Sequence, residues 1–380
     1  MELYFDNSAT TKPYISVIDV MGEAMREYWG NPSSLHTKGY EAEKKLGEAR
    51  KTILSSLNIR DPHAELFFTA GGTEADNLAL IGTMHAKSRN KGKKLITTKS
   101  EHPAILNTAK QLESEGYEVV YLSCRGGKVD INEYMAALDK NTVMVSIMTV
   151  NNETGAVYDL KKLFSMAKSV SPDIVTHTDA VQAYMKLKLS PESIKCDMMT
   201  LSGHKIHGPK GIGALYVSAE CMKKRTLSPH TFGGGQEKGF RSGTENLPAI
   251  LGFAEAAAAG IYPRSVGELR EYILKNLPAE IKPNIPAAVS PHILNITLPG
   301  IRSETMLHFL SSKDIYVSSG SACSSNSGHH NYVLPDFGLS DKEADSSVRI
   351  SLDPSLTRED ADRLIEALNE GLMTLVRSSK

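Results

Sequence analysis

Cysteine is scarce in this chain of 380 residues, which has four, at positions 124, 196, 221 and 323. Their spacing is irregular and no Cys-x-x-Cys pair occurs, so we expect neither a disulfide framework nor a cysteine-based zinc site. A few isolated thiols are typical of a reducing compartment, and we therefore expect a cytoplasmic protein.

The sequence also lacks long apolar runs and an excess of charge of either sign. No segment approaches the roughly 18 uncharged apolar residues that span a membrane, and the N-terminal residues show no signal-peptide pattern. The formal net charge is −1, and the longest basic stretch, Lys91 to Lys94, has no interleaved aromatic residues. We expect neither a membrane nor a nucleic acid as a partner.

What the chain does have is a regular alternation of short apolar runs and helix-length segments through about residue 260. This alternation is typical of an α/β protein, in which helices connect the strands of a mainly parallel sheet. The expected strands are 65–69, 94–98, 118–122, 142–149, 174–179, 198–202 and 213–217, and the expected helices include 74–85, 103–115, 160–169 and 246–259.

The pattern changes after residue 260. Prolines separate a predicted helix at 266–276 from short strands at 292–297 and 348–351, and apolar residues at helical spacing predict a last helix at 358–375. We therefore expect a large domain over residues 15–260 and a small α+β domain formed by residues 1–14 and 261–380.

The densest group of chemically useful residues surrounds Lys205. Residues 201–213 read LSGHKIHGPKGIG and lie between two predicted strands, so glycines flank the lysine, and Ser202 and His204 can hydrogen-bond a phosphate. A lysine in such a loop can form a Schiff base when its amine is neutral. A phosphate contact and an ordinary surface position are the alternatives.

Groups that suit the same cofactor follow other predicted strands. Asp179 ends the strand 174–179, where α/β sheets bind ligands, and beside a Schiff-base lysine it can keep a pyridinium nitrogen protonated. Taken alone, Asp179 could equally cap a helix. Gly72 and Thr73 open a helix whose free N–H groups suit a phosphate, and His102 can stack on an aromatic ring or be purely structural.

These loops fit pyridoxal phosphate, and the chain resembles the pyridoxal-phosphate-dependent cysteine desulfurases of the class V aminotransferase type. The matching stretches are YFDNSATT (4–11), NPSSLH (31–36), GGTEADN (71–77), EHP (101–103), VNNETG (150–155), HTDAVQ (177–182), SGHKIHGP (202–209), and GGGQ (233–236) through RSGTEN (241–246). The resemblance implies fold type I of the pyridoxal-phosphate enzymes, with a mainly parallel seven-stranded sheet flanked by helices and a small α+β domain.

The resemblance also implies roles for the residues that bind the cofactor. Lys205 holds it as a Schiff base, Asp179 pairs with its pyridinium nitrogen, Gln182 bonds its ring hydroxyl, and His102 stacks on the ring. The implied phosphate contacts come from Gly72, Thr73, Ser202 and His204, and from Thr244 of the partner subunit in a homodimer.

At the substrate end, the resemblance implies that Asn152 and Arg349 hold the carboxylate of L-cysteine, and that Asn152 also binds the cofactor. The planar fork of an arginine suits a carboxylate. On the residues alone, Arg349 could instead form a surface ion pair.

Cys323 distinguishes a desulfurase from its aminotransferase relatives. It lies in a Ser/Gly-rich run, 317–330, whose composition predicts an accessible loop, while the other three cysteines are expected to pack in the core. In the implied reaction Lys205 and His102 move protons, and Cys323 takes the substrate sulfur as a persulfide, leaving L-alanine. The persulfide passes to a protein acceptor, an iron–sulfur scaffold or a thiolation protein.

Two features depart from the family pattern. After Arg349 the chain reads ISLDPSLT instead of a glycine and an aromatic-Thr-Thr turn, and we expect Asp353 to cap the last helix rather than to weaken substrate binding. Two adjacent histidines, His329 and His330, lie in the Cys323 loop, where we expect no metal site.

Two other functions stay open at this point. One is a pyridoxal-phosphate-dependent lyase or transaminase that acts on another amino acid, including selenocysteine, in which Cys323 is incidental. The other is a binding or regulatory protein that keeps the cofactor pocket without turnover.

Overall fold

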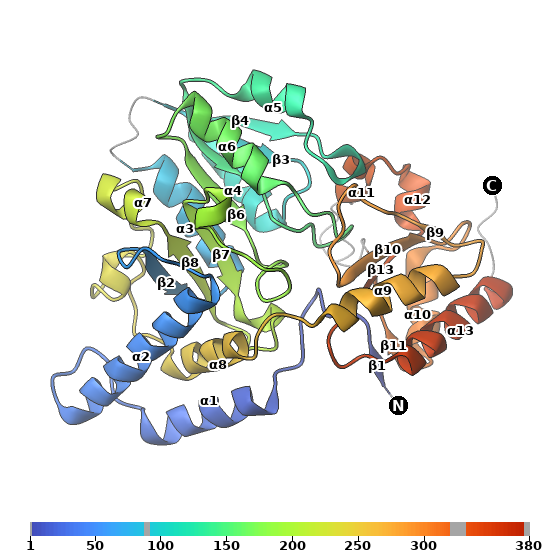
Figure 1. Cartoon of the computed structure of the whole chain (residues 1–380), viewed down its shortest axis with the longest axis horizontal. Coiled ribbons are helices and arrows are strands. Elements are labelled where there is room, and N and C mark those ends of the chain that lie inside the picture. The colour runs from blue at the N-terminus through green and yellow to red at the C-terminus, as the bar shows by residue number, and fades with distance from the viewer. Residues whose placement is uncertain (1, 87–91, 320–331, 376–380) are drawn as a thin grey trace.

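The computed structural model describes residues 2–86, 92–319 and 332–375 (Figure 1). Its main sheet has seven strands in the order β2-β8-β7-β6-β5-β3-β4, and within this sheet β8 alone runs against its neighbours. The strands are β2 (Glu65–Thr69), β3 (Lys94–Thr98), β4 (Glu118–Leu122), β5 (Thr142–Ser146), β6 (Val175–Asp179), β7 (Met198–Ser202) and β8 (Gly213–Val217). The predicted mainly parallel α/β sheet is thus confirmed.

Helices cover both faces of this sheet because alternate residues of its strands are apolar on each face. On one face, Phe68 of β2 packs in the same core as Ile53 and Phe253, which lie on α2 (Thr37–Ser56) and α8 (Leu247–Ala258). On the other face, Phe67 of β2 shares a core with α3 (Gly72–Met84) and α4 (Pro103–Ser114). The remaining helices around the sheet are α1 (Ile15–Glu27), α5 (Ile131–Ala137), α6 (Leu160–Val170) and α7 (Ala219–Lys224).

A second, four-stranded antiparallel sheet follows in the order β12-β13-β10-β9. Its strands are β9 (Lys282–Pro283), β10 (Ile293–Thr297), β12 (Ser318–Ser319) and β13 (Ser347–Ser351), and its apolar core includes residues of α9 (Arg264–Asn276), α10 (Ser303–Ser311) and α13 (Arg358–Thr374). Two short helices, α11 (Val333–Phe337) and α12 (Asp341–Asp345), precede β13.

The N-terminal segment connects the two sheets. β1 (Leu3–Tyr4) pairs in parallel with β11 (Ile315–Tyr316), beside the second sheet. A few residues later, the amide of Thr11 donates to the carbonyl of His204, just after β7 of the main sheet. This segment therefore passes along the carboxyl ends of the main strands.

The expectation that Asp353 caps the last helix is wrong. The N-cap of α13 is Thr357, which forms a reciprocal capping box with Asp360. The Asp353 carboxylate instead accepts bonds from the amide and hydroxyl of Ser355, and so shapes the turn that precedes the helix.

None of the helices in the described ranges is long and apolar enough to cross a membrane.

Candidate active site

A pocket of about 660 Å³ opens at the carboxyl ends of the main strands. This is the edge at which α/β sheets bind ligands. The pocket is lined by Ala9, Thr10, Ala70, Gly71, Gly72, Thr73, Glu74, Ser202, His204, Lys210, Gly211 and Ile212. The predicted phosphate residues Gly72, Thr73, Ser202 and His204 are therefore brought to one place.

The phosphate end of the pocket combines a bare helix terminus with an unpaired hydroxyl. α3 begins at Gly72 with no side-chain cap, so its first N–H groups are available to a ligand. The hydroxyl of Ser202 is buried without a hydrogen-bond partner among the described residues. A buried hydroxyl without a partner is costly, and a bound phosphate would satisfy it. The residues present therefore fit a phosphate-bearing cofactor.

His204 is held as a neutral imidazole. Burial first and the Lys205 cation second lower its pKa to about 4. Its Nδ1 lies 3.2 Å from the hydroxyl of Thr10. A neutral ring can donate one hydrogen bond to a phosphate without adding charge.

Lys205 ends a short 3₁₀ turn after β7, beside the N-terminal segment. Its Nζ donates to the carbonyls of Ser8 and Ala9 at 2.6 and 2.7 Å. These two acceptors stabilise the protonated amine.

Asp179 lies at the end of β6 and is buried. Its carboxylate accepts the amide of Val181 at 2.8 Å. Burial raises its pKa, and the charges of His102 and Lys205 act in the opposite direction. Turns rather than a helix follow it, so the alternative role as a helix cap is wrong. A protonated ring nitrogen beside this carboxylate would offset the cost of its burial.

His102 caps α4, because its Nδ1 accepts the amide of Ala104 at 3.2 Å. The surrounding protein lowers its pKa by desolvation, the Asp179 charge raises it, and the Lys205 cation lowers it further. His102 as a whole residue is exposed, although its protein surroundings desolvate the imidazole. The neutral ring carries its proton on Nε2, since Nδ1 is the acceptor.

Two buried carboxyl groups beside Asp179 were not predicted from the sequence. Glu101 accepts bonds from the Thr98 hydroxyl and the Met148 amide, both at 2.9 Å, and burial raises its pKa to about 8. The pKa of Asp76 is raised by burial and by the Asp179 charge. Glu101 lies in the EHP stretch (101–103) that matches the family, but no role was predicted for it.

Arg349 lies on β13 with its side chain almost entirely buried. It pairs with the Asp6 carboxylate at 2.7 Å and donates to the backbone carbonyl of Asn152 at 2.9 Å. The alternative of a surface ion pair is therefore wrong, because this ion pair lies inside the protein. Asn152 and Arg349, the two predicted carboxylate-binding residues, are in direct contact.

Asn151 organises the loop that contains Asn152, a role that was not predicted. Its Oδ1 accepts from the amides of Glu153 and Thr154, and its Nδ2 donates to the carbonyl of Ser100. Asn151 thus fixes the loop next to the segment that carries His102.

Gln182 and Thr244 differ in their relation to the pocket. Gln182 is buried and donates from Nε2 to the carbonyl of Ser8 at 2.8 Å. Thr244 is exposed and does not line this pocket. Within one chain, then, the described site residues that were predicted converge, except for Thr244. Cys323, His329 and His330 lie outside the described residues.

The described residues on either side of the Cys323 segment are anchored next to the site. Ser318 of β12 pairs with Arg349 across the antiparallel ladder. On the other side, the hydroxyl of Tyr332 donates to the carbonyl of Glu101 at 3.1 Å. Ser318 and Tyr332 thus lie beside Arg349 and Glu101, within the group of predicted site residues.

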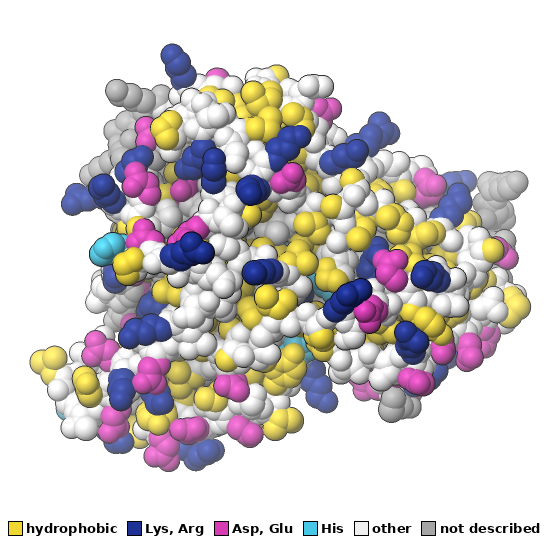
Figure 2. All heavy atoms as spheres, viewed as in Figure 1, with side chains coloured by type: hydrophobic (Ala, Val, Ile, Leu, Met, Phe, Trp, Pro, Cys, Tyr) yellow, Lys and Arg dark blue, Asp and Glu magenta, His cyan; other side chains and the backbone are white. Residues whose placement is uncertain are grey.

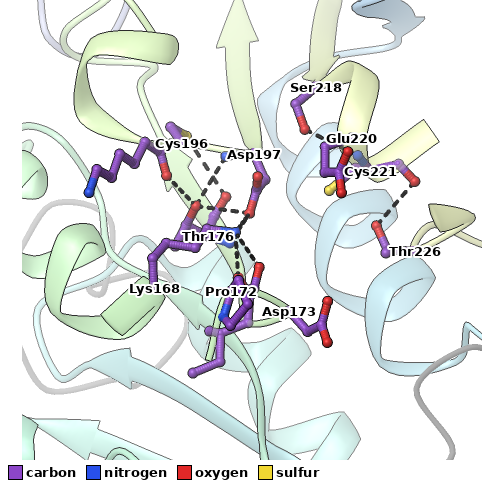
Figure 3. Close-up of polar contacts among 12 residues, drawn as sticks. Lys168, Pro172, Asp173, Thr176, Cys196, Asp197, Ser218, Glu220, Cys221 and Thr226 are labelled. Atoms are coloured by element: carbon purple, nitrogen blue, oxygen red, sulfur yellow. Dashed lines mark hydrogen bonds and ion pairs between the residues drawn. The ribbon is translucent and has the colours of Figure 1, made fainter. Parts of the chain in front are cut away.

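The other three cysteines are buried, as predicted. Cys196 and Cys221 lie at the opposite end of the strands, near the ion pair of Lys168 with Asp197 (Figure 3). Burial raises the pKa of Cys124 and of Cys221 to about 11, and that of Cys196 well above its ordinary value. None of the three is suited to act as a thiolate nucleophile.

Comparison with known proteins agrees with this geometry. The family model Aminotransferase class-V matches residues 3–364. A NifS/IcsS protein homolog of Lactobacillus delbrueckii subsp. bulgaricus is 41% identical over 97% of this chain and 96% of its own length. A cysteine desulfurase of Trichormus azollae is 38% identical over 97% of this chain and 92% of its own length.

Solved structures give the same result. A NifS-like protein with 33% identity superposes with a TM-score of 0.89 over 99% of this chain and 100% of its own. A structure of SspA in complex with cysteine, also 33% identical, has a TM-score of 0.82 over 93% of this chain and 99% of its own. The chain belongs to the class V aminotransferase family, in the branch of the cysteine desulfurases.

Proposed function

We propose that this protein is a pyridoxal-phosphate-dependent cysteine desulfurase. It converts L-cysteine to L-alanine, keeps the sulfur as a persulfide on Cys323 and passes it to a protein acceptor, an iron–sulfur scaffold or a thiolation protein. The working form is a cytoplasmic homodimer. The observation that carries the proposal is the convergence of Lys205, Asp179 and His102 beside the bare N-terminus of α3.

The residues of the pocket would hold the cofactor at both of its ends. Its phosphate would lie at the N-terminus of α3, against Ser202 and His204, with Thr244 of the partner subunit. His102 and Asp179 would hold its ring, with Lys205 as the attachment point. Bound in this way, pyridoxal phosphate supplies an electron sink for the bonds at the substrate α-carbon.

Lys205 acts as the base that moves the α-proton. When its amine takes up a proton, the carbonyls of Ser8 and Ala9 are already within hydrogen-bond distance. The charge therefore needs no rearrangement of the protein to be stabilised. The Nε2 proton of His102 can be given to the substrate and recovered, since its Nδ1 is occupied.

Arg349 binds the substrate carboxylate. Asp6 and the Asn152 carbonyl hold the guanidinium in place, and its Nε has no hydrogen-bond partner among the described residues. The substrate therefore meets an arginine whose orientation is already fixed.

Cys323 performs the sulfur transfer. Its thiolate attacks the substrate Sγ, a sulfur–sulfur bond forms, and the Cβ–Sγ bond of the substrate breaks. The electron pair left on the carbon skeleton takes up a proton, and the product is released as L-alanine. The sulfur keeps its place on Cys323 until an acceptor thiolate removes it.

The test uses the purified protein loaded with pyridoxal phosphate. We expect equal amounts of alanine and sulfide from L-cysteine in the presence of a thiol reductant. Cys323→Ser should keep the visible absorption of the cofactor and form no persulfide, and Cys221→Ser, a change at a buried thiol, should retain transfer. Undiminished sulfur transfer by Cys323→Ser would contradict the proposal and favour a lyase of another type.

A further inference from the structure

A second lysine lies buried beside the active site, in the turn that follows β6. Lys186 is 2% exposed, although lysine is almost never fully buried unless it has a partner. The residue before it, Met185, has a φ of 55°, in the left-handed region that side-chain-bearing residues rarely adopt. The backbone is thus held in an unfavourable conformation where Lys186 enters the core.

The amine of Lys186 is one end of a short chain of hydrogen bonds. Its Nζ donates to the Oε1 of Gln182 at 3.1 Å. The Nε2 of Gln182 donates to the carbonyl of Ser8 at 2.8 Å, and the same carbonyl accepts the Nζ of Lys205 at 2.6 Å. Two lysines are therefore connected through one carboxamide and one backbone carbonyl.

These hydrogen bonds fix the orientation of the Gln182 side chain. A backbone carbonyl can only accept, so the NH₂ end of the carboxamide must face Ser8. The oxygen end then faces Lys186, which supplies a donor there. The carboxamide has two N–H groups, and the bond to Ser8 uses one of them. The other could donate to the ring hydroxyl of the cofactor, the role that the resemblance implies for Gln182.

The surroundings of Lys186 are rich in positive charge. Its pKa lies well below the ordinary value, because of burial first and of the cations of Lys205 and Arg349 after it. Its charge also acts on the imidazoles of His204, His207 and His292. The carboxylate of Asp353 acts on His207 as well. Lys205 is in addition close to Asp179 and His102.

We propose that Lys186 is a positioning residue, which holds the Gln182 carboxamide in the one orientation that supports Lys205 and the cofactor hydroxyl. This proposal rests on the proposed function, because it takes Lys205 to be the residue that attaches pyridoxal phosphate. Lys186 itself contacts neither the substrate nor the cofactor. Its effect passes through Gln182.

The experiment follows the visible absorption of the loaded protein as a function of pH, which reports the protonation of the link between Lys205 and the cofactor. In Lys186→Met the oxygen of Gln182 loses its donor, only the Ser8 carbonyl still holds the carboxamide, and the hydrogen bond to the ring hydroxyl is weakened. A weaker hydrogen bond makes the neutral form of the link between Lys205 and the cofactor less stable. We therefore expect the pH midpoint of the absorption change to rise by about one pH unit. Lys186→Gln, which keeps a donor, should give a smaller shift.

A double-variant cycle separates positioning from a simple effect of charge. Gln182→Ala should raise the midpoint by itself, and adding Lys186→Met to it should change nothing further. If the charge of Lys186 acted through space, Lys186→Met would shift the midpoint equally in the wild type and in Gln182→Ala. That result would overturn the proposal, and so would the absence of a shift in Lys186→Met alone. If Lys186→Met does not fold, as judged by thermal unfolding, Lys186→Leu, which also removes the donor, carries the same cycle.

The visible spectrum of the loaded wild-type protein distinguishes failure of the role of Lys186 from failure of the proposed function. A visible band that Lys205→Ala abolishes, with no change in midpoint in the Lys186 variants, overturns the role of Lys186 and leaves the proposed function intact. Absence of any such band in the wild type overturns the proposed function, and the role of Lys186 with it.

Discussion

At the scale of single residues, Glu101 makes the stability of the cofactor-free protein depend on pH. Its pKa is raised from 4.5 to about 8 by burial, so folding favours the protonated form. Its contribution to the free energy of unfolding is fully present below about pH 4.5, falls as the pH rises, and is lost by about pH 8. The whole change is at most about 5 kcal/mol.

Glu101→Gln should remove this dependence, because the amide keeps the shape of the neutral carboxyl. We expect urea unfolding between pH 5 and 8 to show the wild type losing stability relative to the variant by several kcal/mol. Thr98→Val, which alters a hydrogen-bond partner of Glu101 but not its charge, is the control. Parallel pH profiles for wild type and Glu101→Gln would contradict this prediction.

A second residue-scale prediction concerns Gly213, which lies against the loop of the phosphate site. A Cβ at this position would lie 2.6 Å from the backbone carbon of Gly71. Gly213→Ala must therefore move the loop that precedes α3, and we expect the dissociation constant for pyridoxal phosphate to rise about tenfold or more. Fluorescence or absorbance titration measures it.

Gly47 provides the matched control for this substitution. It lies within α2, and a Cβ there would meet nothing within 4 Å. Gly47→Ala should leave cofactor affinity unchanged and stabilise the protein by about 0.5–1 kcal/mol, because alanine favours a helix. If Gly213→Ala and Gly47→Ala lost the same affinity for pyridoxal phosphate, the contact between residue 213 and Gly71 would not be the cause.

Much of the site could be predicted at this scale, because several of its residues lie in short sequence motifs. Gly72 and Lys205 each lie in a short motif whose chemistry can be read from its neighbours. Glu101, Lys186 and the Ser8 carbonyl could not be predicted, because their importance comes from burial and from contacts between distant parts of the chain.

At the scale of elements, one buried ion pair anchors the segment that leads to Thr244. Glu237, whose side chain is 2% exposed, receives two bonds from Arg50 of α2 and one from the amide of Phe68 in β2. Glu237 and Lys238 have φ of 48° and 55°, so two successive residues are held in the left-handed region. The ion pair holds this backbone against β2.

Arg50→Met should therefore be costly, because it leaves a buried carboxylate unpaired. We expect a loss of about 3–5 kcal/mol in the free energy of unfolding, measured with urea. Lys238→Met removes a neighbouring ion pair with Glu65 whose lysine is 62% exposed, and should cost at most about 1 kcal/mol. Similar losses in the two variants would contradict the special role of Arg50.

The elements themselves were predicted well where the apolar pattern is strong. The strands 65–69, 94–98, 118–122, 198–202 and 213–217 have the predicted bounds, whereas 142–149 ends three residues early, at Ser146. The reversed direction of β8 was not predicted. Only residues 203–212 separate it from β7, too few for the crossover that parallel strands need.

At the scale of the whole molecule, we propose that residues 15–260 form a large domain and that residues 1–14 with 261–380 form a small one. What supports the division is that Leu3 and Phe5 pack in the same apolar core as β10, β13 and α13. Arg349 and the described strand β12 belong to that second part, and Lys205 belongs to the first.

The proposed homodimer has support from the surface. Large apolar side chains are exposed near and on α1 and α2 and near the segment before Thr244, namely Trp29, Leu35, Tyr40 and Phe232. Figure 2 shows apolar side chains on the surface over α1 and α2, at its lower left. Where exposed apolar residues gather into a patch, they are typical of a surface that a partner covers.

If Thr244 completes the site of the partner subunit, two inactive variants should restore each other. A Lys205→Ala protomer still supplies Thr244, and a Thr244→Asp protomer, whose added charge repels the phosphate, still supplies Lys205. In a mixed dimer one site then has both native residues. Random exchange of equal amounts should therefore restore about one quarter of the wild-type desulfurase sites.

The measurement is alanine formation after the two variants are mixed, partly unfolded and refolded together. Each variant refolded alone is the control, and size-exclusion chromatography checks that both still form dimers. If Thr244 instead served the site of its own chain, each site in the mixed dimer would lack either Lys205 or Thr244. Activity would then stay at the level of the separate variants, and this outcome would show that each subunit has a complete site of its own.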